Sequence, residues 1–132
     1  MKRTGILNTE LAAHCAALGH TDRVAVVDCG LPIQAEVPTV DLALVHGVPT
    51  FEETLAALLD ELVVEAHTYA SESEGETCLQ LLSAEADRLG PGRNVPHQDL
   101  KSLVGECAFA VRTGEATPYA NVVLHCGVAF GR

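Results

Sequence analysis

The segment Arg23–Asp28 (RVAVVD) limits the fold more than any other, because four consecutive apolar residues, three of them valine, stand between two charged ones. Apolar side chains at successive positions, instead of alternating ones, require burial on both faces of a strand. Strands of this kind occur in sheets that have helices on both sides. The run therefore predicts a strand inside a layered α/β fold.

Helix-type and strand-type segments alternate around this run. Asn8 is the predicted cap of a helix that ends near Leu18, and Thr50 with Glu53 forms a capping box that opens another. Further helices are expected at 78–89 and 97–104, and further strands at 40–45, 63–69, 107–112 and 121–126. This order predicts a three-layer α/β sandwich whose central sheet is largely parallel and flanked by helices, with ligands at the carboxyl ends of the strands. Residues 1–132 are expected to form a single domain.

The overall charge, the cysteines and the start of the chain indicate which partners and which cellular compartment to expect. A formal net charge of −10 repels phosphate backbones and anionic lipid, so no nucleic acid and no membrane are expected as partners. The five cysteines form no CxxC pair, which argues against a disulfide framework or structural zinc and suits a reducing cytoplasm. The basic start of the chain leads into a run broken by polar residues, so neither a signal peptide nor a membrane span is predicted.

The motifs of common cofactor and metal enzymes are missing from the sequence. It contains no GxGxxG or GxxxxGK[ST] phosphate loop, no GxSxG nucleophile elbow and no HExxH zinc motif. The six histidines are scattered along the chain. We therefore expect no cofactor and no metal.

Two polar residues flank the first predicted strand. His20 follows a helix, and imidazole exchanges protons near neutral pH, although its spacing alone favours an ordinary surface histidine. Asp28, at the end of a buried strand, needs hydrogen-bond partners. It holds a ligand hydroxyl, orients His20, or caps the turn that follows, and the residues alone leave these three interpretations open.

Three further candidates lie later in the chain. His97 precedes a short predicted helix and is, on its own, an ordinary helix-terminal residue. Tyr119 offers a ring face and a hydroxyl, and Asn121 offers a donor and an acceptor, which suit neutral polyols; otherwise they are a loop tyrosine and a strand-initiating asparagine. No catalytic part is predicted for three other residues, Asp41, His46 and His125.

Six stretches in this order resemble the D-ribose pyranase family. They are LGHTD (18–22), VVDCGLPI (26–33), VDLALVHGVPTF (40–51), PHQDLK (96–101), RTGEATPYAN (112–121) and CGVAF (126–130). The resemblance implies interconversion of the pyranose and furanose forms, and of the anomers, of free D-ribose without a cofactor. The sister fucose mutarotases share the GH and Y-x-N features, but the DCGLPI and VDLAL stretches look more like the ribose branch.

The resemblance also implies roles for the candidate residues. His20 becomes the acid–base residue, which exchanges a proton with the ring oxygen. Asp28, His97 and the stretch Tyr119, Ala120 and Asn121 become substrate-binding residues, and Asp28 holds a hydroxyl or orients His20. Family members form ring-shaped homo-oligomers, commonly decamers, with sites near subunit boundaries.

Two rival functions and three departures from the family pattern accompany this resemblance. The rivals are a non-catalytic ribose-binding accessory of a transport system and a purely structural ring-forming protein. Cys29 stands where the family usually has alanine, the stretch 71–95 matches poorly and is shortened, and residues 131–132 extend past the usual end. Because of the poor match over 71–95, the resemblance does not extend to the third helix or to any subunit contact that it makes.

Overall fold

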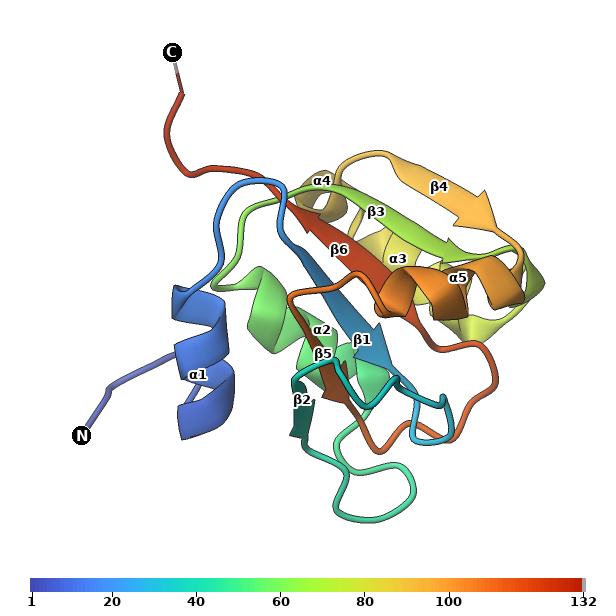
Figure 1. Ribbon diagram of the computed structural model, residues 1–132, viewed down its shortest axis with the longest axis horizontal. Coiled ribbons are helices and arrows are strands. Elements are labelled where there is room, and N and C mark those ends of the chain that lie inside the picture. Colours follow the sequence, from blue (N-terminus) through green and yellow to red (C-terminus); the bar gives the residue numbers. More distant parts are fainter. Residues whose placement is uncertain (132) are drawn as a thin grey trace.

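A mixed sheet of six strands forms the centre of the computed structural model, which describes residues 1–131. The strands lie in the order β2-β5-β1-β6-β3-β4, and β6 runs antiparallel to both neighbours while the others share one direction (Figure 1). Their bounds are β1 (Arg23–Val27), β2 (Thr39–Asp41), β3 (Val64–Ala70), β4 (Gly92–Val95), β5 (Phe109–Arg112) and β6 (Val122–Cys126). The prediction of a largely parallel sheet is confirmed.

Helices cover both faces of this sheet. Alternate residues of β1 face opposite ways: Val24 and Val26 join the core under α1 to α4, whereas Ala25 and Val27 join the core under α5. Figure 1 shows α5 in front of the sheet and α2 behind it. The helices are α1 (Thr9–Ala16), α2 (Phe51–Leu59), α3 (Thr77–Ala84), α4 (Ala86–Leu89) and α5 (His97–Val104), with a 3₁₀ turn η1 (Ser71–Ser73). The three predicted layers are therefore present.

The predicted elements and the structure differ in three places. The segment Gly92–Val95 forms the edge strand β4, which the sequence does not reveal because only its last residue, Val95, is apolar and the other three are exposed. The single helix predicted over 78–89 divides at Glu85, where the backbone leaves the helical region. The strand predicted over 40–45 ends at Asp41, whose carboxylate accepts the backbone N–H two residues on and so turns the chain.

The strand directions sort the candidate residues between two edges of the sheet. The ends of β1 and β4 and the start of β6 lie on the side of the sheet where the parallel strands end, which we call the carboxyl edge. The starts of β1 and β3 and the end of β6 lie at the opposite, amino edge, from which the chain after β6 extends away (Figure 1). Within residues 1–131, no helix has the length and apolarity needed to cross a bilayer.

Candidate functional site

Asp28 and Asn121 form the centre of a polar cluster at the carboxyl edge. Asp28 follows β1 and Asn121 precedes β6, so the antiparallel pairing of these strands brings the two residues together. The Asp28 N–H donates to Asn121 Oδ1 (2.8 Å), and Asn121 Nδ2 donates to Asp28 Oδ2 (3.1 Å). Gly30 N–H donates to Asp28 Oδ1 (2.9 Å). Asn121 is completely buried, so its amide fixes the Asp28 carboxylate, which is itself half-buried.

His97 and Tyr119 lie beside one another at the same edge. His97 begins α5, and its ring meets the Tyr119 ring edge-on with centroids 5.2 Å apart. Tyr119 has a left-handed backbone (φ 61°), a conformation that is strained for a residue with a side chain. The Nδ1 atom of His97 is buried and has no hydrogen-bond partner within residues 1–131. A buried imidazole nitrogen without a partner is suited to binding a ligand hydroxyl.

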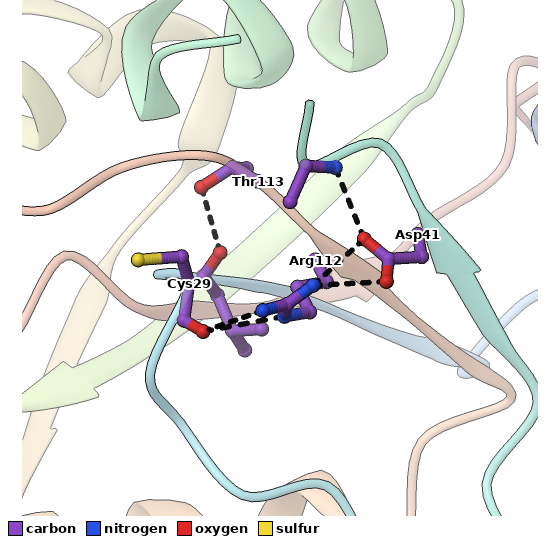
Figure 2. A network of polar contacts seen from close by, with 6 residues as sticks. Cys29, Asp41, Arg112 and Thr113 are labelled. Carbon is purple, nitrogen blue, oxygen red and sulfur yellow. Dashed lines mark hydrogen bonds and ion pairs between the residues drawn. The ribbon is translucent and has the colours of Figure 1, made fainter. Parts of the chain in front are cut away.

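The backbone on either side of Asp28 is fixed by the end of β5 (Figure 2). Thr113 donates to the Val27 carbonyl from both its N–H (3.0 Å) and its hydroxyl (2.8 Å). Arg112 donates to the Cys29 carbonyl from Nε (3.2 Å) and Nη2 (3.0 Å), and its Nη1 donates to both oxygens of Asp41 (3.1 and 2.9 Å). Asp28 thus stands between two anchored carbonyls.

Glu115 joins this cluster to the helix layer. Its carbonyl accepts the Cys29 N–H (2.9 Å), and its carboxylate accepts the Phe51 N–H at the start of α2 (2.9 Å) and the Thr117 hydroxyl (2.8 Å). Burial, the largest influence, raises the pKa of this carboxyl, but the hydrogen bonds from Phe51 and Thr117 outweigh burial and leave the pKa below its usual value. Glu115 is therefore a charged anchor for the loop that precedes Tyr119.

His20 lies at the amino edge, away from this cluster. Its loop is joined to β6 by two hydrogen bonds, Thr21 N–H to the Cys126 carbonyl (3.0 Å) and Cys126 N–H to the Asp22 carbonyl (2.9 Å). The imidazole is half-exposed, and its Nε2 lies 3.2 Å from Glu65 Oε2. It borders a hollow of about 490 Å³ whose apolar lining includes Leu18, Leu62, Val63, Val128 and Phe130.

The length of β1 separates the two groups within one chain. At about 3.3 Å per strand residue, the six steps from Asp22 to Asp28 span roughly 20 Å. Asp28 is hydrogen-bonded to Asn121 and Gly30 and lies at the other edge from His20. The structure therefore brings together Asp28, His97, Tyr119, Ala120 and Asn121 at one edge, and leaves His20 at the other. Within one chain Asp28 does not orient His20.

Comparison with known proteins identifies the family. The sequence model of the family described as RbsD / FucU transport protein family matches residues 1–129. The chain belongs to the RbsD / FucU family. A member of the family from Streptomyces avermitilis, named D-ribose pyranase, is 50% identical over 134 residues, which cover 98% of this chain and 100% of the relative. The predicted resemblance to the D-ribose pyranase family is confirmed.

Two solved structures of the RbsD / FucU family are similar to this one. The structure of Bacillus subtilis RbsD complexed with D-ribose has a TM-score of 0.92 and 38% identity, and the match covers 98% of this chain and all of that one. The fucose mutarotase from Streptococcus pneumoniae in complex with L-fucose has a TM-score of 0.80 but only 18% identity, and the match again covers 98% of this chain and all of that one. At this identity, the similarity supports the fold alone.

Several residues that shape this RbsD / FucU site were not assigned a role from the sequence. Arg112 and Glu115 stand inside the stretch RTGEATPYAN. Arg112 donates to the Cys29 carbonyl and Glu115 accepts the Phe51 N–H, and such contacts with a distant backbone have no sequence pattern of their own. Glu65 is one of many acidic residues, and its place beside His20 depends on strand pairing. The carboxylate of Asp41 accepts hydrogen bonds from the Ala43 N–H and from Arg112, which is a structural role.

Proposed function

We propose that this protein is a D-ribose pyranase, an isomerase that interconverts the pyranose and furanose forms of free D-ribose by opening and reclosing the ring. The observation that carries the proposal is the match along nearly the whole chain to relatives named D-ribose pyranase and to RbsD complexed with D-ribose. The cluster at the carboxyl edge supports it, because a carboxylate, a phenol and an imidazole nitrogen are suitable partners for sugar hydroxyls.

Ring opening of a cyclic hemiacetal requires two proton movements. One proton leaves the anomeric hydroxyl and one is delivered to the ring oxygen, which breaks the bond between the anomeric carbon and that oxygen. Attack by a different hydroxyl on the resulting aldehyde closes the other ring and reverses both proton transfers. His20 exchanges the proton with the ring oxygen, while Asp28, His97 and Tyr119 bind hydroxyls. Both Ala120 and Asn121 are buried. Asn121 fixes Asp28 through its side-chain amide, and both residues contribute through their backbone.

The complete site forms between two copies of the chain, with His20 from one copy and the carboxyl-edge cluster from the next. Contact between the amino edge of one copy and the carboxyl edge of another is heterologous, and such contacts form a ring when the rotation between copies closes. Exposed apolar side chains near both edges support this arrangement: Leu44 is 76% and Phe130 is 77% exposed. The ring is a decamer located in the cytoplasm, where the five free cysteines remain reduced. Sedimentation equilibrium measures the number of copies.

The rate of exchange between ribose ring forms, measured by NMR magnetisation transfer, tests the proposed function. The wild-type protein is expected to raise the exchange rate above that of buffer. His20→Ala is expected to lower the catalysed rate by about 10²–10⁴-fold, the usual contribution of a positioned acid–base group. Circular dichroism melting and calorimetric binding of ribose serve as controls, because His20 contributes to catalysis more than to folding.

The rival functions give different results in the same experiment. A ribose-binding accessory binds ribose calorimetrically but leaves the exchange rate at the buffer value, and a purely structural ring shows no binding. Either result contradicts the proposal. Equal rates for the wild type and His20→Ala would remove His20 from the mechanism. A panel of pentoses and L-fucose then identifies the preferred sugar.

Replacement of Arg112 is expected to disturb the site without touching the sugar. Arg112→Leu removes both donors from the Cys29 carbonyl and leaves Asp41 without its cation, so the backbone next to Asp28 loses its anchor. Outer residues that orient a site typically contribute about 10–100-fold, and we expect a loss of that size in kcat/KM. Arg112→Lys is expected to restore little of this activity, because lysine lacks the planar fork of donors that arginine has. Arg93→Leu, on the exposed strand β4, is the matched control, and equal activity of the two variants would contradict the role given to Arg112.

A further inference from the structure

The contact between His20 and Glu65 restricts which imidazole nitrogen is free. A carboxylate accepts hydrogen bonds and has no proton to donate, so the Nε2 atom, 3.2 Å from Glu65 Oε2, carries the hydrogen. In the neutral imidazole, Nδ1 is then the atom with the free lone pair. Both side chains are about half-exposed, and ion pairs of this kind add little to folding stability. The contact therefore matters more for geometry than for stability.

A β-bulge directs the Glu65 side chain. The pairing of β3 with β6 shifts between Val64, which faces Cys126, and Ala66, which faces His125. Glu65 is thus the extra residue, without a paired residue on β6. Bulges change the direction of a side chain and are frequent next to active sites. An unbroken ladder would give Glu65 the ordinary alternating direction of a strand residue.

Two glycines leave the space that Glu65 occupies. A Cβ atom on Gly127 would lie 3.3 Å from both the Cβ and the Oε2 of Glu65. A Cβ atom on Gly90, whose φ is +68°, would lie 2.3 Å from the Glu65 carbonyl oxygen. Both the side chain and the backbone of Glu65 are therefore accommodated by residues that lack a side chain.

The loop that carries His20 is also fixed in place. Gly19 N–H donates to Asp22 Oδ2 (2.8 Å) and closes the loop. Thr21 adopts a left-handed backbone (φ 72°), which is unusual for a β-branched residue and turns the chain directly after His20. The imidazole therefore has a defined starting point, and Glu65 supplies a fixed acceptor for one of its two nitrogens.

From these features we infer that Glu65 is a positioning residue for catalysis: it accepts the Nε2–H of His20 and so presents Nδ1 as the atom that exchanges a proton with the sugar. The inference rests on the proposed function of His20. It adds the identity of the reacting nitrogen and the residue that selects it. Glu65 acts through His20 and does not touch ribose.

Three replacements of Glu65 separate position from charge. Glu65→Leu removes the acceptor and is expected to lower kcat about 10–100-fold while leaving KM unchanged. Glu65→Gln keeps a carbonyl acceptor at the same reach without the charge, and is expected to stay within about threefold of the wild type. Glu65→Asp keeps the charge but is one methylene shorter, and is expected to resemble the leucine variant. Glu106→Leu, which changes an exposed glutamate elsewhere, is the matched control.

The same replacements in a His20→Ala background give a double-mutant cycle. If Glu65 acts through His20, Glu65→Leu has no further effect on the residual rate in that background. A lower rate there, a raised KM, wild-type activity of Glu65→Leu, or an active Glu65→Asp beside an inactive Glu65→Gln would each overturn the inference. These results differ from a failure of the proposed function, in which the wild type itself leaves ribose exchange at the buffer rate.

Discussion

Two inactive variants, His20→Ala and Asp28→Asn, are expected to restore activity when their subunits assemble in one ring. Each chain carries His20 and Asp28 at opposite edges of its sheet, roughly 20 Å apart along β1. A site that uses both residues therefore takes them from different copies. In a mixed ring, some contacts join the intact His20 of an Asp28→Asn subunit to the intact Asp28 of a His20→Ala subunit.

The amount of restored activity follows from the geometry. In a ring with equal and random mixing, a contact contains both intact residues in roughly one case out of four, so about a quarter of the wild-type activity is expected. Co-expression of the two variants with different affinity tags, followed by tandem purification, isolates mixed rings. Ribose ring exchange, measured by NMR, then gives the activity per subunit.

A pair of variants with both changes at the same edge is the control. Asp28→Asn and Asn121→Ala both alter the carboxyl-edge cluster, in which the two side chains are hydrogen-bonded to each other. Every site in such a mixed ring carries one of the two changes, so no activity returns. Activity in this control, or none in the His20→Ala and Asp28→Asn mixture, would contradict a site built from two copies.

The layers and the main strands follow from sequence patterns that are local. The run Arg23–Asp28 predicts β1, and Thr50 with Glu53 forms the capping box seen at the start of α2. The helix predicted at 97–104 has the observed bounds. These elements are predictable because burial on both faces, capping and helical periodicity all act within a few residues.

Strand β4 and the register of β3 depend on distant partners. Gly92–Val95 has no apolar pattern, and its extended form results from pairing with β3, where Gly92 lies opposite His67. The bulge at Glu65 arises from the way β3 meets β6. Propensity in short exposed segments is weak, so tertiary pairing decides their conformation.

In the candidate site, too, some features could be predicted from the sequence and others depend on distant contacts. Strand order brings Asp28 next to Asn121, and the predicted position of Asp28 at a strand end already indicated the carboxyl edge. The position of His20 at the other edge follows equally from the chain, since it precedes the strand that Asp28 follows. Arg112 was not predicted, because a side chain that binds a carbonyl 83 residues away leaves no periodic trace in the sequence.

The protein is also expected to lose stability at alkaline pH, because burial raises the pKa of four thiols, among them Cys126. Burial is the main cause that raises the pKa of Cys15 from 9.0 to about 11, and those of Cys78 and Cys107 from 9.0 to about 12. Above pH 9 the unfolded chain releases these protons while the folded chain keeps them. The stability that the neutral thiols contribute is therefore complete below pH 9 and decreases as the pH rises toward 11–12.

The expected loss in the free energy of unfolding is large for a small domain. Each thiol lowers the free energy of unfolding by at most about 1.4 kcal/mol per pH unit, so Cys15, Cys78 and Cys107 together remove up to about 4 kcal/mol between pH 7 and pH 10, from a typical total of about 5–15 kcal/mol. Urea unfolding at fixed protein concentration with a reductant, at pH 7, 8, 9 and 10, measures the decline. Cys78→Ala starts from a lower stability but loses one titrating thiol, so its decline to pH 10 should be smaller by about 1 kcal/mol. Identical declines for the variant and the wild type would show that thiol burial does not cause the alkaline loss.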